Sequence, residues 1–300
     1  MSYPSQAILE FNPLFVFPMV VSASTTKITW ELLPEDFVLD DEPVDNVNQP
    51  SLAAALTESL ELAGKLPETA LATTNYGICA TVNGKFVIKA PDWAYVPQIT
   101  VSREEIQRSY TPHKQGQIPA VVMEFLSDSD GSEYSNKHTY PPGKWFYYEQ
   151  VLQVPNYIIF QPDIGELEIF HLHENGHYKL RSPDENNRYW LTEMELFIGV
   201  WPGKRENRQG YWLRWWNQDG NLLLWGSELV QQERLAKEQE RIAKEQERLA
   251  KETAQQEANQ ERLARETAQQ EANQERLAKE TALKRLQELE KRLRDAGISD

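Results

Sequence analysis

Two carboxylates stand at or near segments whose other residues are mostly apolar and suited to β-strands. Asp92 follows Pro91 and precedes Trp93, and Glu124 lies inside the segment 120–126. An unpaired ion in a core strand costs on the order of several kcal/mol, so each acid there needs a compensating partner. Two such acids predict that two neighbouring strands direct oxygen ligands at one hard cation, Mg2+ or Mn2+.

A lysine follows these acids in the sequence. Lys144 stands next to Gly143 at the start of a predicted helix that ends before Pro155, and Lys137 is a competing candidate. Two metal-binding acids and an ammonium group are the parts of a metal-dependent phosphodiesterase. The structural alternatives are a turn or capping role for Asp92, a salt-bridged strand position for Glu124 and an ordinary helix-start lysine at 144. A cation beside a helix N-terminus is unfavourable, which favours a functional role for Lys144.

The elements that would position these residues indicate a mixed α/β (α+β) fold. The helix expected over 50–62 ends at Gly64, and Asn83-Gly84 predicts a tight hairpin. Because a helix separates the strands expected at 120–126 and 157–160, these two strands are predicted to be parallel. The other expected strands cover residues 78–82, 85–89 and 167–172.

Composition limits the protein class. The chain has 300 residues and one cysteine, Cys79, which excludes an intramolecular disulfide and fits a reducing compartment. The apolar stretch 14–21 contains Pro18 and has no basic residue before it, so it resembles neither a signal peptide nor a spanning helix. We therefore expect a soluble, cytoplasmic protein with no membrane partner.

The net charge of −15 is unevenly distributed. From Glu228 onward there are 17 acids and 15 bases, so the preceding part holds 29 acids and 16 bases, a net charge of −13. An acidic body repels phosphate backbones at long range, which counts against tight non-specific binding of nucleic acid. A local basic groove or a bound metal ion would lower this barrier.

The tail beyond Gln231 has no aromatic residue and no proline, and it repeats with periods of 7 and 14 residues. This pattern predicts one long helix from about residue 229 to 295. Its seam has about one large apolar residue per heptad, opposed by Gln239, Gln246 and Thr253. Only Ala282, Leu286, Leu289 and Leu293 have full coiled-coil spacing. A coiled coil that forms a homo-oligomer and a solvated single helix held by ion pairs are both open.

Six tryptophans lie between residues 189 and 225: Trp190, Trp201, Trp212, Trp215, Trp216 and Trp225. Such aromatics, with Arg214 among them, could stack on bases. More often they form the core of a small sheet, which is the interpretation we favour.

The motifs above resemble the Uma-type family of restriction-endonuclease-like proteins, in the PD-(D/E)XK nuclease superfamily. The resemblance covers roughly residues 30 to 175 and is carried by Pro91-Asp92, Glu124-Phe125-Leu126-Ser127, Lys144 and the segment 154–162. It implies a mixed sheet flanked by helices, a divalent metal and nuclease activity.

The resemblance also implies roles for individual residues. Asp92 and Glu124 would be side-chain ligands of Mg2+, with the Phe125 carbonyl as a third ligand. Lys144 would assist, because the superfamily's usual lysine position, two residues after the second acid, is occupied by Leu126. An earlier helix often supplies a further acid in these proteins, and the candidates are Glu35, Asp36 and Glu42.

These observations predict four parts: a tail (1–30), a nuclease core (31–180), a Trp-rich β appendage (181–228) and a long helix (229–300). The first hypothesis is a Mg2+-dependent endonuclease acting on nucleic acid, DNA before RNA, with Asp92, Glu124 and Lys144 at its centre. The alternative is a catalytically inactive adaptor of the same fold that oligomerises through its coiled coil. A third hypothesis is a structure-specific nucleic-acid binder without cleavage.

Overall fold

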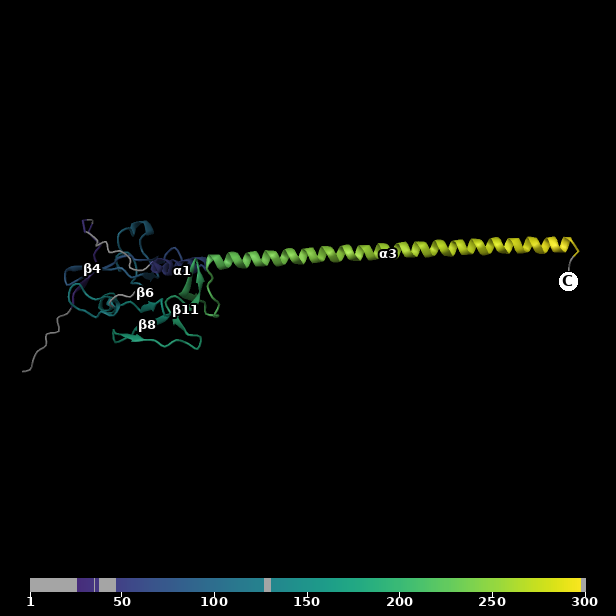
Figure 1. The fold of residues 1–300 in the computed structure, drawn as a ribbon. Helices are drawn as coiled ribbons and strands as arrows, with labels where there is room; N and C mark the ends of the chain where they lie inside the picture. Colours follow the sequence, from purple (N-terminus) through teal and green to yellow (C-terminus); the bar gives the residue numbers. More distant parts are fainter. Residues whose placement is uncertain (1–25, 35, 38–46, 127–130, 298–300) are drawn as a thin grey trace, which may run out of the picture. The chain divides into compact units, whose positions relative to one another are not determined.

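A computed structural model of the protein describes residues 26–34, 36–37, 47–126 and 131–297. The chain divides into two units, Met1–Gly226 and Ser227–Asp300. The first unit contains three sheets and several short helices, and the second is part of one long helix (Figure 1). The fold is mixed α/β, as the sequence predicts.

A six-stranded sheet forms the centre of the first unit. Its order is β2-β5-β6-β7-β8-β9, and only the β6–β7 pair is parallel, which confirms the predicted crossover. The strands are β2 (Leu71–Thr73), β5 (Trp93–Val96), β6 (Val121–Phe125), β7 (Asn156–Gln161), β8 (Glu166–Leu172) and β9 (Tyr178–Leu180).

The crossover between β6 and β7 is not the uniform α-helix that the sequence predicts. It begins as a short α-helix, α2 (Lys144–Phe146), and continues as a π-helix, η3 (Tyr147–Leu152). It ends at Gln153, whose φ of 56° is left-handed, just before the Val154-Pro155 pair where a helix cannot continue. Two 3-10 turns, η1 (Arg103–Glu105) and η2 (Ser132–Tyr134), lie in the loops around β6.

Both faces of the central sheet are covered. On one face lie helix α1 (Asn48–Leu62) and a three-stranded sheet of β10 (Arg188–Leu191), β11 (Leu196–Arg205) and β12 (Arg208–Trp216). On the other lie the crossover helix and the sheet of β1 (Ile28–Thr29), β3 (Ile78–Val82) and β4 (Lys85–Lys89). Asn83 and Gly84, with φ of 52° and 78°, form the predicted hairpin turn.

The tryptophans of the β10-β11-β12 sheet are mainly core residues, as the sequence analysis favours. Trp212, Trp215 and Trp225 are buried in the same cluster as α1 and β6. The Trp215 indole donates to the Leu56 carbonyl at 3.2 Å, and the Arg214 guanidinium lies 3.5 Å from the Trp225 ring centre. Residues on both sides of position 180 share this core. The predicted boundary near residue 180 stays a prediction.

Helix α3 (Gly226–Asp295) makes up nearly all of the second unit, and it begins three residues before the predicted start. None of its residues is buried, and ion pairs three or four residues apart follow its surface, for example Glu233–Lys237 at 2.7 Å and Glu247–Lys251 at 2.6 Å. No helix in the described part of the chain is both long and apolar enough to cross a membrane.

Replacing Trp215 by alanine tests the shared core. The change removes a fully buried indole that contacts α1 and the Trp93 ring, so we expect the free energy of unfolding of the first unit to fall by about 3–5 kcal/mol. Urea unfolding followed by tryptophan fluorescence measures this. As a control, Leu263→Ala on the exposed surface of α3 is expected to leave that transition unchanged.

Candidate metal centre and active site

Asp92, just before strand β5, lies across from Glu124 on the neighbouring strand β6. The antiparallel register pairs Trp93 of β5 with Met123 of β6, and one further step places Asp92 opposite Glu124. Opposite residues of an antiparallel pair project from the same face of the sheet. Since Met123 packs on the α1 side and its neighbour Val122 on the crossover side, Asp92 and Glu124 share the face covered by the crossover helix.

A hydrogen bond fixes Asp92 to the end of β6. Its Oδ2 accepts the Phe125 backbone N–H at 2.6 Å. Pro91, just before it, accepts the Asn75 N–H through its carbonyl at 3.1 Å, which holds the chain where it enters β5. The Asp92 carboxylate is thus held beside the residue that follows Glu124.

Glu124 is only 1% exposed, and each of its oxygens has a donor from the crossover helix. Lys144 Nζ lies 3.0 Å from Oε2, and the Tyr148 hydroxyl donates to Oε1 at 2.9 Å. Positions 144 and 148 are four residues apart, so both side chains lie on one side of the helix. The Lys144 ammonium offsets part of the cost of burying the Glu124 carboxylate.

A third carboxylate, Glu133, reaches the same lysine. Its Oε1 lies 3.4 Å from Lys144 Nζ, and its backbone carbonyl accepts the Tyr157 hydroxyl at 2.9 Å. With all groups ionised, Asp92, Glu124 and Glu133 against Lys144 leave a net charge of −2. This excess equals the charge of one divalent cation.

The acids respond to this charge excess and to burial. The pKa of Glu124 is raised to about 7, because burial and the Asp92 charge raise it more than Lys144 and Tyr148 lower it. Burial also raises the pKa of Asp92 to about 6, against the hydrogen bond from Phe125. Burial alone would lower the pKa of Lys144, but Glu124, Glu133 and Asp92 outweigh it and raise the pKa, so the ammonium is charged.

Helix α1 supplies a further polar group at this edge of the sheet. The Gln49 side-chain amide donates to the Phe125 carbonyl at 2.8 Å, and Gln49 is buried. The sequence analysis missed Gln49, although it is a polar residue on the buried stripe of α1 that continues through Leu52 and Leu56. A polar residue on an apolar stripe is a usable signal for a buried hydrogen bond.

The donors at this centre suit a hard cation. Two carboxylates and the Phe125 carbonyl are all oxygen donors, which Mg2+ and Mn2+ prefer. In the described part of the chain, no three His, Cys, Asp or Glu side chains lie together as a metal site. Mg2+ in proteins commonly uses only one or two carboxylates and takes its other ligands from water and substrate phosphates, so the residues present fit such an ion.

The remaining predicted residues are placed differently. Lys137 is exposed, and its carbonyl accepts the Gly143 N–H at 2.9 Å, so the structure brings Lys144 rather than Lys137 to Glu124. Asp36 is exposed in a turn whose carbonyls at Pro34 and Phe37 bind Arg108. Glu35 and Glu42 lie outside the described residues.

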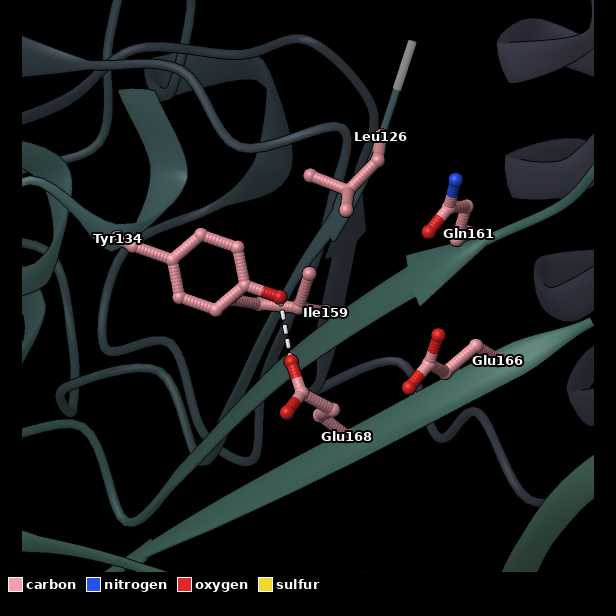
Figure 2. A pocket seen from close by; sticks show the side chains of 6 residues that line it. All are labelled: Leu126, Tyr134, Ile159, Gln161, Glu166 and Glu168. Carbon is pink, nitrogen blue, oxygen red and sulfur yellow. Dashed lines mark hydrogen bonds between the residues drawn. The ribbon is translucent and has the colours of Figure 1, made fainter. Parts of the chain in front are cut away.

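A pocket of about 200 Å³ adjoins the centre on the same face of the sheet. The register aligns Glu124 with Ile159 of β7, and Ile159 with Glu168 of β8. Figure 2 shows the Tyr134 hydroxyl directed at the Glu168 carboxylate, with the side chains of Gln161 and Glu166 beside them. The full lining is Leu126, Tyr134, Ile159, Gln161, Glu166 and Glu168.

No role at this centre is predicted from the sequence for Glu133 or Tyr148. Glu133 lies in a loop without periodicity, so nothing in its surroundings could have indicated its contact with Lys144. Tyr148 could have been found from its spacing of four residues after Lys144 on the predicted helix.

Comparison with known proteins places the chain in a family. Residues 45–201, more than half of the chain, match the Uma2 family, described as "Putative restriction endonuclease", and the chain belongs to that family. A crystal structure titled as a putative nuclease belonging to DUF820, from Anabaena variabilis, is similar with 11% identity and a TM-score of 0.31, covering 49% of this chain and 73% of that one. No curated protein matches the chain.

The raised pKa values of Asp92 and Glu124 predict how stability varies with pH. The folded state holds protons that the unfolded chain releases, so stability from these groups is full below pH 4 and is lost as pH rises through about 6 and 7. With divalent ions removed, the free energy of unfolding should fall over this range, by at most about 1.4 kcal/mol per pH unit for each group.

Urea unfolding between pH 5 and 8 measures this slope, and Glu124→Gln should reduce it. The control is Glu149→Gln on the crossover helix, because a lowered pKa confines the effect of Glu149 to more acidic pH. An undiminished slope in E124Q would contradict the assignment.

Proposed function

We propose that this protein is a divalent-metal-dependent endonuclease that hydrolyses phosphodiester bonds of nucleic acid, with DNA as the first substrate to test. The observation that carries the proposal is the meeting of Asp92 and Glu124 on one face of the sheet with Lys144 on Glu124. Membership of a family described as "Putative restriction endonuclease" supports it. Asp92, Glu124 and the Phe125 carbonyl would hold Mg2+ or Mn2+.

The chain's own residues would have separate roles in this reaction. When bound, the cation supplies a more acidic water and neutralises phosphate charge. The Phe125 N–H holds the Asp92 carboxylate in place, and Lys144 and Tyr148 hold the Glu124 carboxylate. The Lys144 ammonium, charged at neutral pH, offsets negative charge on the phosphate oxygens and orients the attacking water.

Neutralising either ligand tests the proposal. Asp92→Asn and Glu124→Gln keep the side-chain shape but remove a charged oxygen donor, so we expect each to weaken Mn2+ binding at least about tenfold in calorimetry and to abolish metal-dependent cleavage of plasmid DNA. Lys144→Ala should reduce cleavage more than metal binding.

Glu168→Gln is the matched control, because Glu168 lies on the same sheet face but is separated from Glu124 by Ile159. Equal Mn2+ affinity in the wild type, D92N and E124Q would refute the site. Metal binding by the wild type without cleavage of DNA or RNA would instead favour the second candidate function.

That second candidate is a catalytically inactive adaptor, which keeps the nuclease fold as a scaffold. Two observations favour it: the net charge of −13 before Glu228, which repels nucleic acid, and the engagement of Lys144 with both Glu124 and Glu133. A binder that recognises nucleic-acid structure without cutting it would show gel shifts that weaken steeply with salt.

In either case, α3 would join copies of the chain through its last turns. Leu286, Leu289 and Leu293 are 49–58% exposed and have coiled-coil spacing. With Leu286 at position a, Arg285 and Glu290 occupy g and e positions that attract each other in a parallel pair. Leu277 lies nine residues before Leu286, about two and a half helical turns, so the earlier apolar residues face the opposite side.

Light scattering over a range of protein concentrations tests this association. We expect Leu289→Lys to shift the protein toward the monomer, because a charge would replace the centre of the apolar stripe. Leu249→Lys, on the earlier stripe, should have a smaller effect. A wild type that stays monomeric at all concentrations would assign α3 as a single helix held by its own ion pairs.

A further inference from the structure

Tyr148 has a position that the proposed reaction does not by itself require. It is a fully buried residue on the π-helical part of the crossover, and its hydroxyl donates to Glu124 Oε1. Its ring lies against those of Tyr147 and Tyr157, with centroid distances of 5.9 and 5.1 Å. Its carbonyl accepts the Val154 N–H at 2.9 Å, so ring and backbone are both held in place.

With Lys144 on the other oxygen, this contact occupies both ends of the Glu124 carboxylate. Each carboxylate oxygen has two lone pairs, so each keeps about one for a metal ion. Turning the carboxylate to present both oxygens to one ion would break a hydrogen bond at a site that is 1% exposed. Leaving a buried donor unpaired is unfavourable. The arrangement therefore favours coordination of Glu124 through a single oxygen.

Coordination through one or two oxygens distinguishes the biological divalent cations. Ca2+ takes six to eight oxygen ligands and commonly binds a carboxylate through both of its oxygens. Mg2+ requires a near-octahedral shell and keeps several waters, so a carboxylate that offers one oxygen suits it.

We infer that Tyr148 is a positioning residue that sets the metal selectivity of this centre, by holding Glu124 in a one-oxygen mode that favours Mg2+ and Mn2+ over Ca2+. The inference rests on the proposed function, because it requires Asp92 and Glu124 to bind a divalent cation. It concerns how a residue that does not itself bind the ion would set the preference for one divalent ion over another.

Titration calorimetry of the full-length protein with Mg2+, Mn2+ and Ca2+ tests the inference. In Tyr148→Phe, we expect the preference for Mn2+ over Ca2+ to shrink about tenfold relative to the wild type, since partners of metal ligands commonly change affinity by about 10–100-fold. The matched control is Tyr147→Phe, because the Tyr147 hydroxyl donates to the Ile78 carbonyl at 2.9 Å and not to Glu124. Its preference should equal that of the wild type.

The outcomes separate the two proposals. Wild-type binding that D92N abolishes, with an unchanged ion preference in Y148F, overturns the inference and leaves the proposed function standing. Absence of divalent-ion binding by the wild type overturns both. If Y148F does not fold, a crystal structure of the wild type with Mn2+ decides: coordination by one Glu124 oxygen, with Tyr148 on the other, supports the inference, and coordination by both overturns it.

Discussion

The ion pair between Lys144 and Glu124 constrains much of the first unit. A carboxylate on the central strand β6, 1% exposed, needs charge and hydrogen bonds from its own face of the sheet. Both donors, Lys144 and Tyr148, come from the crossover that joins β6 to β7. That crossover must therefore lie over the end of β6 with its first turn at the carboxylate, and β7 then returns parallel to β6.

The same end of the sheet gathers the other polar groups of the centre. Asp92 reaches it from β5 through the Phe125 N–H, and Gln49 reaches it from α1 through the Phe125 carbonyl. These two hydrogen bonds between a side chain and the Phe125 backbone join residues that are 33 and 76 positions apart in the sequence. The centre is thus built where both faces of the sheet meet at one strand end, and its excess of negative charge is a cost to the fold that a bound cation would relieve.

The sequence predicts the parts of this centre better than their contacts. Strand and helix periodicity, the Asn83-Gly84 turn and the proline after the crossover act locally, so α1, the β3–β4 hairpin and the parallel β6–β7 pair follow from them. The placement of Asp92 and Glu124 on adjacent strand segments follows as well. Their roles as ligands remain predictions, as does the choice of Lys144 as the assisting residue.

What the sequence does not reveal depends on tertiary packing. The π-helical turn at 147–152 leaves no periodic signal, since one widened turn shifts the side chains only slightly. Glu133 meets Lys144 through a loop, and Gln49 meets Phe125 across 76 residues. The pairing of the tryptophan-rich strands depends on the α1 surface that they cover, for which Trp215 and Leu56 give the contact. Contacts between residues so far apart can be predicted only when the order of the strands in the sheets is known.

The charge of the body and the chemistry of the centre are physically connected. With 29 acids against 16 bases before Glu228, the first part of the chain repels a phosphate backbone, and the centre, whose net charge is −2 when all its groups are ionised, adds to that repulsion. A divalent cation held by Asp92 and Glu124 would neutralise the centre and present positive charge to a phosphate at short range. Binding of nucleic acid would then depend on prior binding of metal more strongly than in a basic protein. The acidity that argues against a nuclease without its cation is therefore compatible with a nuclease that has bound one.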